Sequence, residues 1–495
     1  DVVVVDRNCH KSVLHAIMMT GAIPVFLTPT RNHYGIIGPI PKQDFKWDSI
    51  RKKIAAHPFA SQVKGKPRVL TITQSTYDGI LYNVEDIKAE LDGHIDTLHF
   101  DEAWLPHAAF HPFYGSFHAM GKKRVRPQTT LVYSTQSTHK LLAALSQASQ
   151  VLVQDAQQVK LDQHLFNEAY LMHTSTSPQY AIIASCDVAA AMMEPPGGTA
   201  LVEESLKEAL DFRRAMRKVG REFGHDWWFT VWGPQRLAEE GVGRAADWML
   251  EPDAAWHGFR DVSAGFNMLD PIKSTIMTPG LDVGGQFAPT GIPAAIVTKF
   301  LVEHGVVVEK TGLYSFFIMF TIGITKGRWN TLVTALQQFK DDYDRDAPLW
   351  RILPEFVAKH PRYERKGLRE LCQDIHQMYA RGDVARLTTE MYLSDLQPAM
   401  KPTDAFSFIA HRKTERVPID QLEGRITTSL LTPYPPGIPL LIPGERFNRR
   451  IVDFLRFVRD FNAAFPGFAT DVHGLIEVVD DEGRRGYAVD CVRDG

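Results

Sequence analysis

The chain has few cysteines and no long apolar run, and both absences narrow the classes of protein it can represent. Its 495 residues include four cysteines, Cys9, Cys186, Cys372 and Cys491, which are far apart and form no C-x-x-C pair. Such cysteines are typical of reduced cytosolic thiols and argue against a disulfide framework. No apolar run approaches the ~20 residues of a membrane-spanning helix, and no signal peptide is recognisable. We therefore expect a cytoplasmic protein without a membrane segment.

The charge balance and the missing catalytic motifs exclude further classes. The chain carries 55 Lys and Arg against 58 Asp and Glu, a net charge of −3, whereas a general nucleic-acid or membrane-surface binder has a basic excess. We find no G-x-S-x-G elbow, no G-x-x-x-x-G-K-[ST] loop and no H-E-x-x-H pair. The sequence thus predicts neither nucleic acid nor membrane as a partner, and it lacks the signatures of several common enzyme classes.

Histidines crowd one region of the chain, which raises the question of a metal site. They are found between residues 94 and 118, and His107 and His111 have the i, i+4 spacing of a helical metal pair. A zinc site would need a third ligand nearby, and Pro106 and Pro112 interrupt any helix there. We expect no metal site. The histidines concerned are His94, His99, His107, His111 and His118.

Short apolar runs alternate with helical patterns in the first part of the chain. This alternation predicts an α/β protein with a parallel, doubly wound sheet, in which ligands bind beyond the carboxyl ends of the strands. The chain is long enough for two or three domains. The predicted strands are 2–5, 25–27, 69–72, 97–100 and 131–133, and the predicted helices are 11–20, 84–91 and 141–150.

The pattern changes near residue 190, and we predict three units. Residues 1–190 form a cofactor-binding domain, 191–345 a smaller second domain, and 346–495 a C-terminal domain. A long helix at 201–223 and strands at 306–309 and 316–321 are expected in the second unit. The third unit is helix-rich at first and continues through the proline cluster at 433–437 into a final α+β piece.

Two polar clusters follow predicted strands and carry the chemistry of the chain. Residues 98–104 (LHFDEAW) deliver the carboxylate of Asp101, and residues 134–140 (STQSTHK) deliver Lys140 among hydroxyls. A pyridoxal phosphate enzyme needs such a lysine amine, an acid against the pyridine nitrogen, and small donors for the phosphate. From the pattern alone, Lys140 could also be a surface lysine and Asp101 a strand-end turn residue or N-cap. A second His-Lys pair, at Lys11, also follows a strand.

Both clusters closely resemble those of the bacterial ornithine/lysine/arginine decarboxylases, and most of all the lysine branch. The resemblance covers essentially the whole chain. It implies a fold-type-I, aspartate aminotransferase-like large domain, a smaller α/β domain and an α+β C-terminal domain. It also implies pyridoxal 5'-phosphate as cofactor and decarboxylation of a basic amino acid, L-lysine giving cadaverine and CO2. Arginine or ornithine decarboxylation, transamination, and a non-catalytic assembly or regulatory paralogue are the alternatives.

The resemblance assigns roles to individual residues. Lys140 forms the Schiff base, and Asp101 keeps the pyridine nitrogen protonated through its opposite charge. Ala103 matches the small residue beneath the ring, Trp104 an aromatic wall, and His10 the histidine that stacks over the ring. Glu102 receives no role from the match, and we expect it to face solvent.

Further assignments concern the phosphate and the subunits. His139 and Ser137 match residues near the cofactor phosphate or ring oxygen. Ser175 aligns with a hydroxyl that the neighbouring subunit supplies to the phosphate, although the family residue is usually Thr. The resemblance therefore implies a homodimer with shared active sites, and it leaves open a ring of dimers such as a decamer.

The substrate clue is the segment 306–314, VVVEKTGLY. Glu309 could simply end a strand, or it could supply a carboxylate to the distal ammonium of a diamino acid. In the family, Glu followed by Lys occurs in the ornithine and lysine branches, and the following T-G-x-Y resembles lysine enzymes. Residues 256–259 and 269–273 also match the family, and we interpret them as architecture.

The start of the chain departs from the family pattern. Residues 1–6, DVVVVD, resemble an interior strand and carry no initial methionine. We therefore expect a fragment whose N-terminal wing domain and phosphate-binding loop at a helix N-terminus lie upstream.

Overall fold

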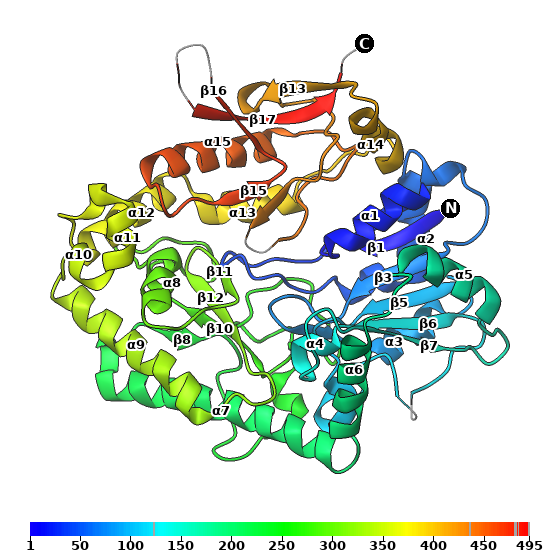
Figure 1. Ribbon diagram of the computed structural model, residues 1–495, viewed down its shortest axis with the longest axis horizontal. Helices are drawn as coiled ribbons and strands as arrows, with labels where there is room; N and C mark the ends of the chain where they lie inside the picture. Colours follow the sequence, from blue (N-terminus) through cyan, green and yellow to red (C-terminus); the bar gives the residue numbers. More distant parts are fainter. Residues whose placement is uncertain (122–123, 435–436, 480–482, 484, 494–495) are drawn as a thin grey trace.

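A central sheet organises the first third of the protein (Figure 1). The computed structural model describes residues 1–121, 124–434, 437–479, 483 and 485–493. The sheet has the strand order β2-β1-β3-β5-β6-β7, in which β7 alone runs antiparallel to its neighbour. Its strands are β1 (Val2–Asp6), β2 (Ile23–Leu27), β3 (Val69–Thr73), β5 (Thr97–Asp101), β6 (Leu131–Gln136) and β7 (Gln150–Gln154).

The central sheet is covered on both faces, which explains its apolar strands. Successive side chains of a strand point to opposite faces. Val4 of β1 joins a core cluster with helices α2 (Trp47–Ala56) and α3 (Val84–Leu91). Val5 joins a second cluster, which contains helix α1 (Lys11–Thr20). Burial of both faces is typical of a parallel sheet between helices, and the predicted α/β class is confirmed by this arrangement.

The predicted helix at 141–150 is wrong. Helix α4 (Thr138–Leu141) ends after one turn, and both Ala143 and Gln147 have positive φ, 58° and 76°. The reason lies in the next strand, because Gln150 of β7 pairs with Gln136 at the end of β6. The connection must return to its starting point, and a helix of ten residues would carry the chain ~15 Å away.

A second, antiparallel sheet follows, in the order β11-β12-β10-β8. Its strands are β8 (Thr230–Val231), β10 (Lys273–Met277), β11 (Lys310–Thr311) and β12 (Ser315–Met319), and long helices pack beside it: α7 (Gly197–Phe223), α8 (Ala294–Glu303) and α9 (Lys326–Asp344). The expectations for 201–223 and 316–321 thus correspond to α7 and β12. The two-strand pair of β4 (Ile80–Tyr82) and β9 (Asn267–Leu269) joins this region to the first sheet.

The predicted strand at 306–309 is wrong. Val306 donates its backbone N–H to Leu301 at the end of α8, and Gly305 between them has a φ of 76°. These valines therefore belong to the turn that ends the helix, and Val307 is 81% exposed. The ladder begins only at Lys310.

The remaining chain forms helices around two small sheets. The sheet β13-β17-β16 and the pair β14-β15 are both antiparallel. Pro435 and Pro436 of the expected proline cluster lie outside the described residues. The division into units ending near residues 190 and 345 stays a prediction. The elements are α10 (Leu349–Ile352), α11 (Pro354–Lys359), α12 (Leu368–Arg381), α13 (Val384–Leu393), α14 (Pro402–Ala410), β13 (Thr414–Pro418), β14 (Thr432–Tyr434), α15 (Arg449–Ala464), β15 (Asp471–His473), β16 (Ile476–Val479) and β17 (Arg485–Val492).

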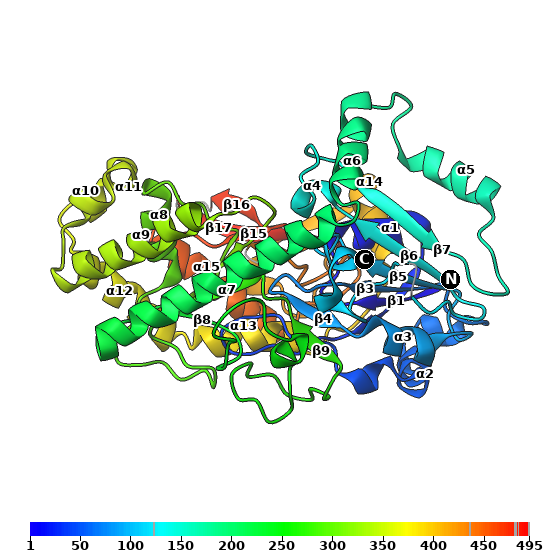
Figure 2. The ribbon, with the colours of Figure 1, turned by 90° about the horizontal axis from the view of Figure 1, so that it is seen from below.

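Two helices lie largely exposed at the edge of the molecule. Figure 2 shows α5 (Gln163–His173) and α6 (Tyr180–Met192) projecting beyond the edge of the central sheet. No residue of α5 is buried. Over the part of the chain that the structure describes, no helix is both long enough and apolar enough to cross a membrane.

Candidate active site

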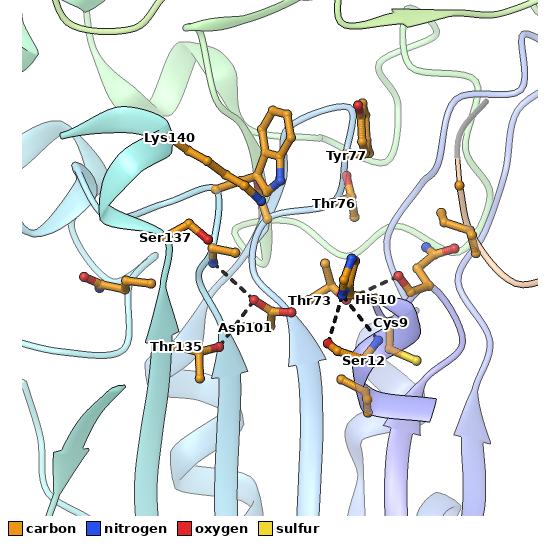
Figure 3. A pocket seen from close by; sticks show the side chains of 18 of the residues that line it. Cys9, His10, Ser12, Thr73, Thr76, Tyr77, Asp101, Thr135, Ser137 and Lys140 are labelled. Atoms are coloured by element: carbon orange, nitrogen blue, oxygen red, sulfur yellow. Dashed lines mark hydrogen bonds between the residues drawn. The ribbon is translucent and has the colours of Figure 1, made fainter. Parts of the chain in front are cut away.

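A cavity of about 830 Å³ lies at the carboxyl ends of the central strands (Figure 3). The loops after β1, β3, β5 and β6 each contribute to its lining, as does the segment 308–311, which leads into strand β11 of the second sheet. Tyr434 and Gly437 line another side of the cavity. Parallel sheets place their ligand sites at this edge.

Lys140 enters the cavity from helix α4, directly after β6. Its side chain is half-buried, and its Nζ lies 5.0 Å from the centre of the Trp104 ring. Burial lowers the pKa of Lys140 below the ordinary lysine value, against the opposing charges of Asp101 and Glu309. An amine with a lowered pKa is more often neutral and therefore a better nucleophile.

Asp101 ends strand β5 and points toward the space that Lys140 enters (Figure 3). Its Oδ1 accepts hydrogen bonds from the Ala103 backbone N–H at 3.2 Å and from the Thr135 hydroxyl at 3.4 Å. Among the described residues, no group donates a hydrogen bond to Oδ2 of Asp101. The carboxylate is thus oriented through one oxygen and keeps the other for a donor in the cavity.

His10 faces these two residues from the loop after β1 (Figure 3). Its Nδ1 accepts the backbone N–H of Ser12 at 3.3 Å and lies 2.8 Å from the Ser12 hydroxyl, so the ring caps helix α1. Burial lowers the pKa of His10, Lys140 and Lys11 lower it further, and Asp101 opposes them. The lowered pKa favours the neutral form of this imidazole at pH 7.

Aromatic side chains form a wall of the cavity. The ring centres of Trp104 and Tyr77 lie 5.0 Å apart, and the ring centre of Phe317 in the second sheet lies 5.8 Å from that of Tyr77. Ala103, expected beneath a cofactor ring, also lines the cavity. Sequence reasoning missed Tyr77, although the polar run 73–78 follows strand β3 in the manner of the two clusters it did recognise.

The expected phosphate contacts are only partly assembled in this chain. Ser137, the N-cap of α4, lines the cavity, whereas His139 on the same turn does not. Ser175 lies between the projecting helices α5 and α6, is exposed, and donates to the Ser177 carbonyl at 3.2 Å. It does not line the cavity of its own chain.

Glu309 reaches the cavity from the side opposite the central sheet. The hydroxyl of Tyr77 donates to its Oε1 at 3.1 Å. Burial and the Glu309 charge raise the pKa of Tyr77, so this hydroxyl keeps its proton and acts as the donor. The next residue, Lys310, forms a close ion pair with the fully buried Asp78, which anchors the segment that carries Glu309.

The prediction that Glu102 faces solvent is wrong. The side chain is fully buried. It accepts hydrogen bonds from the hydroxyl of Ser134 at 2.6 Å and the amide of Gln136 at 3.1 Å, and from the Ala119 backbone N–H at 2.6 Å. The carboxylate therefore ties the end of β5 to β6, and its neighbour Asp101 points to the cavity because alternate residues of a strand face opposite sides.

The crowded histidines have other partners. His107 lies 3.0 Å from the Tyr114 hydroxyl, and His111 lies 2.6 Å from a carboxylate oxygen of Glu203. Within the described ranges, no group of three or more metal-ligating side chains is found.

Comparison with known proteins decides the family. A family model described as "Orn/Lys/Arg decarboxylase, major domain" matches residues 1–328, and one described as "Orn/Lys/Arg decarboxylase, C-terminal domain" matches residues 385–493. The chain belongs to the Orn/Lys/Arg decarboxylase family. The family predicted from the two polar clusters is thereby confirmed.

Among curated members of this family, the chain is similar to lysine and arginine enzymes. It is 51% identical to lysine decarboxylase LdcA of Pseudomonas aeruginosa, with 100% of this chain and 66% of that protein covered. It is 41% identical to the constitutive lysine decarboxylase of Escherichia coli (95% and 64%) and 39% identical to its biodegradative arginine decarboxylase (100% and 67%). The chain thus spans about two thirds of the length of the relatives it matches.

Solved structures of the family share the fold. Lysine decarboxylase A from Pseudomonas aeruginosa superposes with a TM-score of 0.93 at 51% identity, covering 100% of this chain and 66% of that one. The Escherichia coli constitutive lysine decarboxylase gives 0.91 at 39% identity, covering 100% and 67%. The predicted fold-type-I architecture is confirmed by these likenesses.

Proposed function

We propose that the protein to which this chain belongs decarboxylates L-lysine to cadaverine and CO2 with pyridoxal 5'-phosphate as cofactor. One observation carries the proposal above all: the half-buried amine of Lys140 and the oriented carboxylate of Asp101 line the same cavity. The 51% identity to a lysine decarboxylase supports lysine as the substrate.

The residues of the cavity fit the cofactor. Asp101 Oδ2 lacks a donor within the described chain and matches a ring N–H, and Lys140 offers an amine for covalent attachment. The neutral ring of His10 suits one face of a pyridine, and Ser137 offers a hydroxyl to the phosphate. When bound, the pyridinium ring accepts the electron pair that CO2 leaves on the substrate α-carbon.

Each side chain then has a defined task. Lys140 would hold the cofactor through its side-chain amine. Asp101 keeps the proton on the ring nitrogen through charge and hydrogen bonding. His10 and the aromatic wall of Tyr77 and Trp104 restrict water and orient the reacting bond. One proton enters the product at the α-carbon, so each turnover consumes a proton.

Glu309 explains the choice of a basic substrate. Its carboxylate is fixed through Oε1 by Tyr77, which leaves Oε2 for a charged donor. The compact ammonium of lysine suits such a single acceptor, whereas the planar guanidinium of arginine requires a wider, bidentate partner. Ornithine lacks one methylene, which costs only about 1–3 kcal/mol, so it should be a poor substrate.

The active unit we propose is a homodimer with sites at the subunit interface. Ser175 supports this, because it lies exposed beside helices that project from the molecule and does not line its own cavity. In the partner's site its hydroxyl would contact the phosphate.

The test of the proposed chemistry is product analysis with the complete gene product loaded with pyridoxal phosphate. Incubation with L-lysine should release CO2 and cadaverine in equal amounts. Formation of an oxo acid would instead identify a transaminase. A protein that binds the cofactor and converts none of the three basic amino acids would be a non-catalytic paralogue.

A further inference from the structure

We propose that Lys273 is a positioning residue for the reaction at Lys140, because its ammonium ties together the two loops that form the aromatic wall of the cavity. This inference rests on the proposed function for its kinetic consequence. The contacts that carry it are independent of any cofactor.

Lys273 begins strand β10 of the second sheet, yet its side chain ends beneath loops of the central sheet. The side chain is fully buried. Its Nζ donates to the backbone carbonyl of Trp104 at 3.0 Å and forms a close hydrogen bond with the hydroxyl of Ser75. The ammonium of Lys273 therefore connects the loop after β3 with the turn after β5. Strands β3 and β5 are parallel neighbours in the central sheet.

The backbone of the first loop is also packed on the stem of this lysine. A Cβ on Gly79, which has a φ of +100°, would lie 2.9 Å from Cβ of Lys273. Gly79 in turn accepts the backbone N–H of Asp270 at 2.9 Å. Lys273 therefore holds the loop after β3 at two points. Its ammonium binds Ser75, and its stem packs against Gly79.

The carboxylate that pairs with Lys273 is also fully buried. Asp270 Oδ2 lies 3.7 Å from Nζ of Lys273, while Oδ1 accepts the hydroxyl of Tyr114 at 2.8 Å. Burial lowers the pKa of Lys273 to about 8, against the pull of Asp270. The lysine is mostly protonated at pH 7. Burial of an ion pair costs free energy, and proteins with well-packed apolar residues in its place are often equally stable. A contribution to protein stability is therefore a poor explanation for the Lys273–Asp270 pair.

The two loops hold the groups that face the substrate. Trp104 contacts Lys140, with 5.0 Å between ring centre and Nζ, and Tyr77 orients Glu309. Release of the tie would let Trp104 and Tyr77 shift relative to the central strands. A displacement of ~1 Å in a site of this kind costs ~10²-fold in rate.

The test compares Lys273→Met with Lys340→Met in the complete gene product. Lys340 is also buried and paired, with Asp344, but lies on α9, which does not line the cavity. In Lys273→Met we expect kcat for lysine to fall 30- to 100-fold. Amide hydrogens of residues 74–79 and 102–106 should exchange at least tenfold faster, with or without cofactor. Lys340→Met should keep kcat within twofold and leave these amides unchanged.

A kcat for Lys273→Met within threefold of the parent, or unchanged exchange in both loops, would overturn the proposal. Equal loss of kcat and exchange protection in both lysine variants would do the same, by showing global destabilisation. If Lys273→Met does not fold, Ser75→Ala should still speed exchange of 74–79 and lower kcat about tenfold. Should the parent decarboxylate nothing, the proposed function fails, while the exchange data still decide the structural tie.

Discussion

Asp101→Asn tests the electronics of the site most sharply. Oδ1 of Asp101 already accepts two hydrogen bonds, from Ala103 and Thr135. The asparagine must keep its carbonyl oxygen there, so its NH2 group points into the cavity. An N–H donor cannot accept the hydrogen of a protonated ring nitrogen, and the cofactor ring should therefore lose that proton.

The magnitude follows from the lost charge pair. Two unit charges ~3 Å apart attract by ~5 kcal/mol at the effective dielectric constant of ~20 that suits protein sites. Because Asp101 is only half-buried, we expect about half of that to survive screening. With ~1.4 kcal/mol per tenfold change, kcat should fall by about 10² or more.

The assay is steady-state decarboxylation by the loaded, complete gene product, with bound cofactor measured after denaturation. Asp92→Asn is the matched control, since Asp92 accepts backbone N–H groups of Gln128 and Thr129 at the opposite end of the central strands. It should lower stability but leave kcat within twofold. A near-normal kcat in Asp101→Asn with full cofactor content would refute the electron-sink role.

Other predictions address single residues. Lys140→Ala should abolish borohydride-stable attachment of the cofactor and nearly all turnover, whereas Lys11→Ala should retain attachment; the reverse would show that the lysine is misassigned. Glu309→Gln should raise KM for lysine and lower kcat/KM with the cofactor still bound, and unchanged kinetics would remove its substrate role. Mixing Lys140→Ala subunits with inactive Ser175→Ala subunits should restore some activity in hybrid dimers, and a fully active monomer by light scattering would end the shared-site idea. Burial lowers the pKa of His118 to about 4, so the unfolded state binds one more proton than the folded state between pH ~6.5 and ~4. As the pH falls through this window, the free energy of unfolding should decrease by up to ~3 kcal/mol, and by less in His118→Gln. A pH-independent difference in unfolding free energy between the two proteins would contradict this.

The five parallel strands of the central sheet and the main polar clusters could be predicted because they are local. Each apolar run in the first part of the chain is short and ends in polar residues, and parallel strands bring those ends to one edge. Asp101 and Lys140 therefore line one cavity, although more than thirty residues separate them in the sequence. The same reasoning applied to residues 73–78 would have found Tyr77.

What could not be predicted depends on distant partners. Glu102 is buried only because Ser134, Gln136 and Ala119 supply donors from elsewhere in the chain. The apolar run after Lys140 has a helical pattern, but the register of β7 against β6 forces the chain to turn back. Lys273 looks like a strand residue of the second sheet, and only the packing of the two sheets shows that it reaches Ser75 and Trp104.

The central claim is lysine decarboxylation, and a comparison of kcat/KM for L-lysine, L-ornithine and L-arginine tests it most directly. The measurement requires the complete gene product with pyridoxal phosphate. We predict the highest kcat/KM for lysine, a value at least tenfold lower for ornithine, and the lowest for arginine, which the single acceptor at Glu309 cannot bind in bidentate fashion. If arginine or ornithine gives the highest kcat/KM, the assignment of lysine as substrate is wrong.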